Sequence, residues 1–425
     1  MALAATLERL YARRRFGIRP GVERVRLLLD RLGNPENTFR TVHVVGTNGK
    51  GSTSTFLAGI LTAAGHRTAL FTSPHLVNFT ERFRINGDEI DVGHLEPLLD
   101  TVLDAAPDEA TFFEIVTALA VLVFSVNRVD IAIMEAGMGG RSDATAALAG
   151  IMTVITPISR DHCDYLGTTL ENIALEKAGI AKPHTPVIIG RQLPGVQQTL
   201  AICLEPDNPD RFLLEKSATG SWNSKGTLDY RGIDVSLPGI IPGIPGRYQS
   251  DNASLALLAA EVLRSRGFRI DERAMTSGIR HARLSGRMEL VPGSPSLMLD
   301  GAHNPAGAAA LADSLASCEY GNLLLVIGVM ADKDVHAIVS VLAPLAISCY
   351  CVCPKVERSM SDTALASSLS AMGFDARSCG SVGEGIIAAR RDAHSGDLVL
   401  ISGSLFTVGE AKAWLAGKSY EGIRG

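Results

Sequence analysis

The segment Gly46–Thr53 carries the residue types that bind phosphate. It reads Gly-Thr-Asn-Gly-Lys-Gly-Ser-Thr, with a β-branched run before it and an apolar-periodic run after it. Glycines let backbone N–H groups face a phosphate, Lys50 adds a cation, and the hydroxyl of Ser52 or Thr53 can reach Mg²⁺. The segment therefore predicts a phosphate-binding loop between a strand and a helix, the alternative being an ordinary turn.

Polar side chains also follow other predicted strands, where each strand ends. Glu135 closes the apolar run Ile131–Glu135, and His162 lies among acidic residues after the run Met152–Thr156. The carboxyl ends of parallel strands meet at one edge of a sheet, where a carboxylate can hold Mg²⁺ directly or through water. We therefore consider Glu135 a magnesium ligand and His162 a ligand candidate. A solvated glutamate and a hydrogen-bonded surface histidine are the alternatives.

Two predicted helices carry ionisable residues that have a structural alternative. Thr111 and Glu114 have the spacing of a capping box at the start of a helix over 111–127. Lys177 lies in the last turn of a helix over 169–178, where a lysine favours the helix dipole. Position alone therefore assigns no chemistry to Glu114 or to Lys177.

The composition argues against several classes of protein. With 425 residues, 46% of them hydrophobic, the chain can form two cores, because single cores seldom exceed ~250–300 residues. The formal net charge of −5 argues against nucleic acid or a membrane surface as a partner. The first residues lack the apolar core of a signal peptide, and no run of ~18 apolar residues occurs. We therefore expect a cytoplasmic protein.

The seven cysteines are odd in number and scattered, which argues against a disulfide framework. Cys349, Cys351 and Cys353 alternate with other residues, so they share one face of a predicted strand. A metal site would need a second cysteine or histidine pair at ligand spacing, and the sequence offers none. We therefore expect these three residues in a core or half-buried strand.

The elements that position the polar residues form two α/β domains. We expect a P-loop ATPase-like N-terminal domain over 1–283, with a mostly parallel sheet and a small β insertion within 205–247. Residues 284–288 form the expected hinge, and 289–425 a smaller Rossmann-like α/β domain. Its strands are expected near 297–300, 323–328, 347–353 and 397–402. The polar strand ends would then face a cleft between the domains, as in an ATP-using enzyme.

The order of the motifs resembles the folylpolyglutamate synthase and dihydrofolate synthase family, relatives of the muramyl-peptide ligases. The resemblance covers nearly the whole chain. It rests on Gly46–Ser52, Thr72–Leu76, Thr111–Glu114, Glu135–Arg141, Asp161-His162 before Leu166-Gly167, Glu176–Ile180, Gly286-Arg287 and Asp300–Pro305, with a matching final strand at Ile401–Thr407. One such motif is weak, whereas the full set in order is specific.

The resemblance implies an ATP-dependent ligase that forms an amide through an acyl phosphate. It implies L-glutamate as the amino acid and tetrahydrofolate polyglutamates as acceptors. Because Gly21–Val25 is similar to the same stretch of bifunctional members, dihydropteroate is a second implied acceptor. ATP and an anionic carboxylate must be brought together, so cations must offset their repulsion. Mg²⁺ is the implied cofactor, and we expect a monomer.

The resemblance also assigns roles to matching positions. It implies that Lys50, His162 and Lys177 are catalytic, and that Lys177 is carried as a carbamate, an anion able to support a metal. The implied magnesium ligands are Ser73, Glu135 and His162. The implied ATP-binding residues are Gly49, Lys50, Gly51, Ser52, Asn252, Arg287, Asp300 and His303. The implied pteroyl-binding residues are Thr111, Phe112, Phe113, Glu114, Ser142, Asp143 and Ala144.

One position departs from the family pattern, because Ala146 stands where asparagine usually follows Asp-Ala-Thr. This departure bears on the substrate preference. Two rival functions are a Mur-type peptide ligase with another acceptor and, from a different class, a non-catalytic P-loop nucleotide-binding regulator. The motifs Ser73–His75 and Thr111–Glu114 argue against the first rival. The second leaves the polar strand ends of the C-terminal domain without a role.

Overall fold

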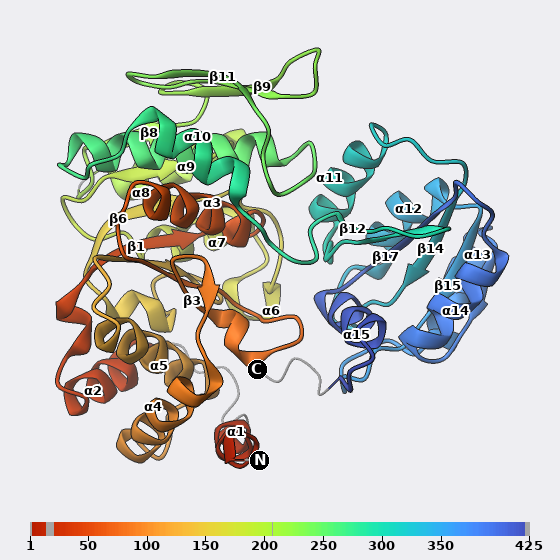
Figure 1. The fold of residues 1–425 in the computed structure, drawn as a ribbon, viewed down its shortest axis with the longest axis horizontal. Coiled ribbons are helices and arrows are strands. Elements are labelled where there is room, and N and C mark those ends of the chain that lie inside the picture. The colour runs from red at the N-terminus through yellow and green to blue at the C-terminus, as the bar shows by residue number, and fades with distance from the viewer. Residues whose placement is uncertain (1, 14–20, 206, 421–425) are drawn as a thin grey trace.

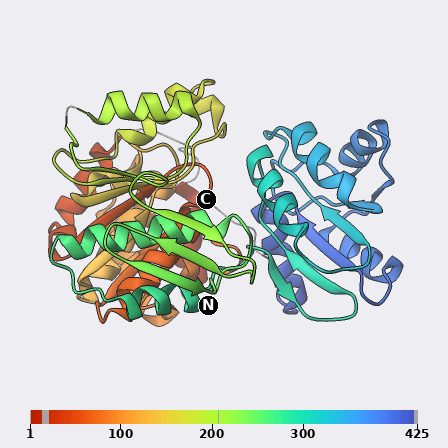
Figure 2. The ribbon, with the colours of Figure 1, turned by 90° about the horizontal axis from the view of Figure 1, so that it is seen from above.

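The computed structural model describes residues 2–13, 21–205 and 207–420, which form two α/β domains lying side by side (Figure 1, Figure 2). The N-terminal domain contains an eight-stranded sheet with the order β4-β3-β2-β5-β1-β6-β7-β8. Only the pairs β2–β3 and β3–β4 are antiparallel, so the predicted mostly parallel sheet is confirmed. Its strands are β1 (Arg40–Val45), β2 (Thr68–Phe71), β3 (Phe83–Ile85), β4 (Asp88–Glu89), β5 (Ile131–Glu135), β6 (Gly150–Ile155), β7 (Val187–Ile189) and β8 (Arg211–Leu213).

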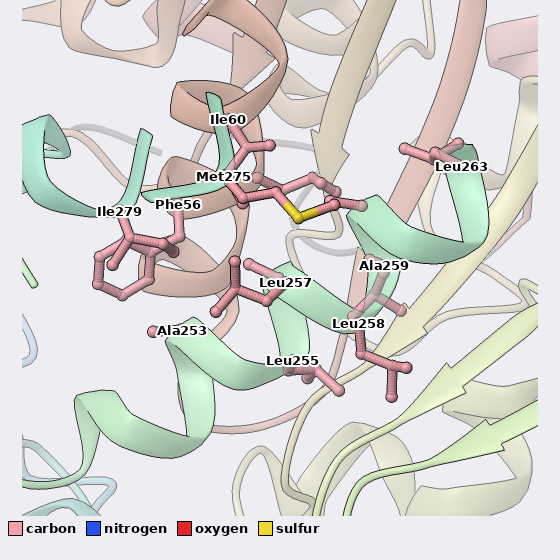
Figure 3. Close-up of a cluster of buried hydrophobic side chains, with 14 of the residues drawn as sticks. Phe56, Ile60, Ala253, Leu255, Leu257, Leu258, Ala259, Leu263, Met275 and Ile279 are labelled. Atoms are coloured by element: carbon pink, nitrogen blue, oxygen red, sulfur yellow. The ribbon is translucent and has the colours of Figure 1, made fainter. Parts of the chain in front are cut away.

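The central strand β5 lies between two helical layers, because all five of its residues are buried. Ile131 and Ile133 face one apolar cluster, whereas Ala132 and Met134 face the opposite one. The first layer consists of α3 (Lys50–Ala63), α9 (Gln249–Ser265) and α10 (Glu272–His281), which meet around Phe56, Leu257 and Met275 (Figure 3). The opposite layer consists of α1 (Ala2–Ala12), α2 (Glu23–Arg31), α4 (Val92–Ala105) and α5 (Phe112–Val126). A third apolar cluster, beside β6 and β7, includes residues of α7 (Leu170–Ala178) and α8 (Pro194–Leu204).

Helices α3 and α10 cross at a pair of glycines. A Cβ atom at Gly59 would lie 2.8 Å from the carbonyl oxygen of Gly278, and one at Gly278 would overlap the backbone of Ile60. A helical glycine costs about 1 kcal/mol relative to alanine, and here the close crossing explains its presence. The crossing holds α3, which begins at Lys50, firmly against α10.

The predicted β insertion is smaller than expected. Its antiparallel sheet consists of β9 (Thr219–Trp222), β10 (Leu228–Arg231) and β11 (Ser236–Ile240). The run at 211–213, which we assigned to the insertion, instead pairs in parallel with β7 as the edge strand β8 of the main sheet. The hydroxyl of Tyr230 donates to Glu261 at 2.6 Å and so anchors the small sheet on α9.

The C-terminal domain contains a six-stranded sheet with the order β12-β13-β17-β14-β15-β16, parallel except for β12. The four predicted strands are confirmed as β13 (Ser296–Leu299), β14 (Leu323–Ile327), β15 (Ser348–Cys351) and β17 (Leu398–Ser402). The edge strands β12 (Glu289–Val291) and β16 (Ala376–Ser378) escaped prediction, since three residues carry almost no periodic signal. The helices of this domain are α11 (Pro305–Leu315), α12 (Val335–Leu342), α13 (Asp362–Ala371), α14 (Val382–Asp392) and α15 (Leu405–Leu415).

Two of the three alternating cysteines lie in the core, as expected. Cys349 and Cys351 are buried in β15 with the apolar residues of the C-terminal domain, and Cys353 follows the strand. Within the described ranges, no cluster of three or more histidine, cysteine or acidic residues could hold a metal by itself. Over the same ranges, no helix has both the length and the apolar character needed to cross a membrane.

Candidate functional site

The predicted phosphate-binding loop lies between β1 and α3, as its sequence suggests. Gly49 has a φ of 85°, which favours glycine, and a Cβ atom there would overlap the side chain of Asn252 from α9. The Nζ of Lys50 donates to the carbonyl oxygen of Thr47 at 3.2 Å. The loop therefore needs glycine both for its backbone conformation and for the close approach of Asn252, a residue that the resemblance assigns to ATP.

Glu135 and Ser73 meet beside this loop. The backbone N–H of Ser73 donates to Oε2 of Glu135 at 3.3 Å, and a Cβ atom at Gly51 would lie 3.6 Å from the same oxygen. Burial raises the pKa of Glu135, while the cation of Lys50 opposes that rise. A carboxylate and a hydroxyl are oxygen donors of the kind that Mg²⁺ prefers, so this pair fits the implied metal.

His162 lies at the end of the loop after β6, immediately before the short helix α6 (Cys163–Leu166). Burial lowers its pKa to about 4, which keeps the imidazole neutral and free to ligate a metal. Its Nε2 lies 3.9 Å from Oδ2 of Asp161. In the part of the chain that the structure describes, no hydrogen bond or ion pair joins His162 to Glu135 or Ser73. The structure thus brings only two of the three implied magnesium ligands into direct contact.

Asp161 joins the two domains, a role that the sequence did not reveal. Lys333 from the C-terminal domain donates to its Oδ1 at 2.6 Å, and Nε2 of His303 lies 3.6 Å from its Oδ2. Close by, Asn304 Nδ2 donates to Oδ1 of Asn48 in the phosphate-binding loop at 3.0 Å. Lys333 follows β14 in the segment Ala-Asp-Lys-Asp. A lysine among acidic residues after a strand end is the sequence feature that could have identified it as a site residue.

Asp300 follows β13 and is buried at the junction of the domains. It accepts hydrogen bonds from the backbone N–H groups of Met288 and Ala302, each at 2.9 Å, and from the hydroxyl of Tyr248 at 3.1 Å. Burial raises its pKa, and the nearby guanidinium of Arg287 opposes that rise. Asp300 therefore fixes the chain that links the domains. Tyr248, which sequence reasoning missed, ties it to the start of α9.

Lys177 reaches the phosphate-binding loop from α7. Its side chain is only 4% exposed, and Nζ donates to the carbonyl oxygen of Gly46 at 2.7 Å. Burial, aided by repulsion from Lys50, lowers the pKa of Lys177 to about 7. The contact with Gly46 replaces the alternative in which Lys177 serves only the end of its own helix. At neutral pH a large share of the amine is uncharged and nucleophilic.

The segment Thr111–Glu114 forms the predicted capping box of α5. Thr111 N donates to Oε2 of Glu114 at 2.7 Å, and the backbone N–H of Glu114 donates to the Thr111 hydroxyl at 3.4 Å. Glu114 also forms an ion pair with Arg24 of α2 at 2.7 Å, which the sequence did not indicate. Thr111 and Glu114 therefore have a structural role in the folded protein, separate from the pteroyl-binding role that the resemblance implies.

The other implied pteroyl residues differ in how accessible they are. Phe112 is buried with its ring 6.0 Å from that of Tyr11, and Ala144 is buried in the same apolar cluster. Asp143 is buried and accepts hydrogen bonds from Thr145 and from the backbone of Met138. The partly exposed residues of the set are Phe113 and Ser142. Phe113 packs against Gly137, where a Cβ atom would overlap its ring.

Two protein families match the chain. The Mur ligase middle domain matches residues 44–200, and the Mur ligase glutamate ligase domain matches residues 286–405. The dihydrofolate synthase/folylpolyglutamate synthase of Escherichia coli (strain K12) is 34% identical over 396 residues, which cover 91% of this chain and 89% of that protein. A probable bifunctional folylpolyglutamate synthase/dihydropteroate synthase of Halobacterium salinarum is 34% identical over 417 residues. That match covers 94% of this chain but only 50% of the relative, so this chain spans about half the length of that protein.

Solved structures agree with these matches. Escherichia coli FolC in complex with DHPP and ADP has a TM-score of 0.89 and 32% identity, covering 97% of this chain and 98% of that chain. The Yersinia pestis bifunctional folylpolyglutamate synthase/dihydrofolate synthase complexed with AMPPNP and a Mn ion has a TM-score of 0.85 and 32% identity, covering 94% of each chain. The chain therefore belongs to the folylpolyglutamate synthase and dihydrofolate synthase family of Mur ligases.

Proposed function

We propose that this protein is an ATP-dependent ligase that adds L-glutamate to tetrahydrofolate polyglutamates and to dihydropteroate. The observation that carries the proposal is the convergence of Lys50, Glu135 and Lys177 on one phosphate-binding loop, with residues of the C-terminal domain touching the same loop. The relatives named for these two activities support the choice of substrates. A cradle for phosphate beside buried charged groups suits the joining of ATP to an anionic acceptor.

The reaction proceeds in two steps. A carboxylate oxygen of the acceptor attacks the γ-phosphorus of ATP, and ADP leaves with the electron pair of the broken P–O bond. The amine of glutamate then attacks the acyl phosphate, and the tetrahedral intermediate expels inorganic phosphate as the amine loses a proton. The segment Gly49–Ser52 would hold the ATP phosphates, and Lys50 would offset the charge that builds up between ATP and the carboxylate.

Ser73 and Glu135, together with His162, would hold Mg²⁺, which would offset the negative charge of the ATP phosphates. The Mn ion in the Yersinia pestis relative supports a divalent metal of this kind. We further propose that the Nζ of Lys177 attacks CO₂ and releases one proton to form a carbamate. The neutral amine, favoured by burial, is the form that this reaction needs.

The remaining assignments are proposals of the same kind. Asn252, Arg287, Asp300 and His303 would complete the ATP site across a hinge at 284–288, between domains at 1–283 and 289–425. Phe113 and Ser142, as the accessible members of the pteroyl set, would contact the ring system directly. Ala146 is buried and its carbonyl oxygen accepts from Lys182 at 2.6 Å, so it would shape this site through packing. The monomeric state and the cytoplasmic location stay predictions.

The decisive experiment offers ATP, Mg²⁺ and L-glutamate with tetrahydrofolate and, separately, with dihydropteroate. We expect ADP and a new amide with both acceptors, detected by coupled assay and mass spectrometry. Product with tetrahydrofolate alone would remove the second activity. Nucleotide binding without product from either acceptor would contradict the assignment, in favour of a regulator, and product with a muramyl peptide instead would favour the Mur-type alternative.

A further inference from the structure

The loop between β2 and β3 reaches out of the N-terminal domain and contacts the C-terminal domain. Leu76, in this loop, is only 6% exposed and belongs to the apolar cluster of the C-terminal domain, together with Val408 of α15. In Figure 1 the loop, drawn in orange, lies on the side of the N-terminal domain that faces α15. A side chain of one domain thus completes the core of the other.

The loop is held in a fixed shape by its last two residues, Glu81 and Arg82, which precede β3. The carboxylate of Glu81 accepts three hydrogen bonds from backbone N–H groups. The donors are Leu76 at 2.7 Å, Val77 at 3.0 Å and Asn78 at 2.8 Å. Arg82 Nε donates to Nδ1 of His75 at 2.8 Å, and its carbonyl oxygen accepts from Thr72 N. With its backbone anchored at both ends, the loop can transmit a displacement instead of absorbing it.

Leu76 packs against Gly286, Val408 and Gly409, which we call the seat of Leu76, and the two glycines allow its close approach. Gly286, in the chain that links the domains, has a φ of 69°, and a Cβ atom there would lie 3.0 Å from Cδ1 of Leu76 and 3.0 Å from Cγ1 of Val408. Gly409, in the middle of α15, allows such close approach that a Cβ atom would overlap the carbonyl oxygen of Leu76. Any larger residue at position 409 would have to push the loop or the domain away.

The other end of the same loop carries Ser73, whose backbone N–H binds Glu135. We propose that Leu76 is a positioning residue, which transmits the position of the C-terminal domain to Ser73 and Glu135 through its seat at Gly286, Val408 and Gly409. The idea rests on the proposed function, because it is the paired action of the two domains on ATP and acceptor that needs this alignment. A misplacement of ~1 Å at a reacting centre can cost ~100-fold in rate.

The test is the variant Gly409→Ala. Alanine favours a helix more than glycine, so α15 itself should persist, whereas the added methyl collides with the carbonyl oxygen of Leu76. We expect kcat to fall by about 10- to 100-fold in a protein that still unfolds cooperatively, and the radius of gyration from small-angle scattering to increase. The matched control is Gly195→Ala in α8, where the added Cβ would meet only the flexible Glu171 carboxylate, at 3.3 Å.

A second pair of variants separates positioning from simple burial. Leu76→Met conserves volume and should retain kcat, whereas Leu76→Ala should lower it by about 10-fold or more. Unchanged kcat and scattering in Gly409→Ala would overturn the inference, as would equal losses in Gly195→Ala. If the wild type makes no amide, the proposed function fails by itself, and unchanged scattering in Gly409→Ala would then still refute the docking of Leu76.

Discussion

Glu135 and Asp300 are both buried carboxylates at the carboxyl end of a core strand, one in each domain, and burial raises the pKa of both. Among the described residues, Glu135 accepts a single hydrogen bond, from Ser73, whereas Asp300 accepts three. A carboxylate has about four acceptor positions, so Glu135 keeps most of its capacity for a cation, whereas most of the capacity of Asp300 is taken by Met288, Ala302 and Tyr248. The two carboxylates therefore differ in role although they occupy similar positions in their sheets: Glu135 can accept a cation, whereas Asp300 mainly accepts hydrogen bonds from the protein.

The largest effect should come from Glu135→Gln. The amide keeps an oxygen for the N–H of Ser73 but loses the negative charge, so the protein should fold while Mg²⁺-dependent turnover falls by at least about 100-fold. Steady-state assays over a Mg²⁺ series, with Tm as a check of folding, measure this. Glu89→Gln, on the exposed strand β4 of the same sheet, is the control and should retain turnover. Full activity in Glu135→Gln would remove the contrast with Asp300.

Lys177→Met should lower turnover by about 10- to 100-fold, because it removes the group that would form a carbamate at the phosphate-binding loop, beside Gly46. Depleting CO₂ should lower the activity of the wild type but leave that of the variant unchanged. Lys182→Met is the matched control, since this partly buried lysine also donates to a backbone carbonyl, that of Ala146, and it should keep most of the turnover. Insensitivity of the wild type to CO₂ would reject the carbamate.

Asp300→Asn should act chiefly on stability, in contrast to Glu135→Gln. The amide can accept from only one of the two backbone N–H groups and turns donors toward the other, so unfolding should become easier by about 1–3 kcal/mol. Denaturant titration measures this loss. Asp397→Asn, which weakens a similar pair of backbone hydrogen bonds, those from Asn322 and His394, should lower stability but spare turnover. An Asp300→Asn protein as stable as the wild type would show that these hydrogen bonds do not hold the backbone at Met288 and Ala302.

The smallest effect is a pH dependence of stability that originates at Lys177. Its pKa of about 7 in the folded protein lies below the ~10.4 of an unfolded chain, so between these values the unfolded state binds more protons. The free energy of unfolding of the wild type should therefore rise with pH from about 7 toward 10, relative to Lys177→Met in CO₂-free buffer. Parallel curves for the two proteins would show that Lys177 titrates normally.

Much of the fold follows from local sequence, and the missed parts have a common cause. The strand, loop and helix around Lys50, the capping box at Thr111 and the strand ending at Glu135 were all predicted, because each depends on neighbours within a few residues. The strands β8, β12 and β16 were missed or misplaced. Each has three residues, so only pairing with a distant strand defines it.

The sequence by itself determined the local elements, namely the glycine-rich loop before α3, the carboxylate at the end of β5 and the capping box of α5, because residue type and short spacing encode them. Only the tertiary structure decided their partners. The bond from Lys177 to Gly46, the bridge from Lys333 to Asp161 and the seat of Leu76 on α15 each join segments far apart in the chain. Burial and proximity of this kind set the pKa of Lys177 and the alignment of the domains, and they arise only when the two sheets and their helices pack.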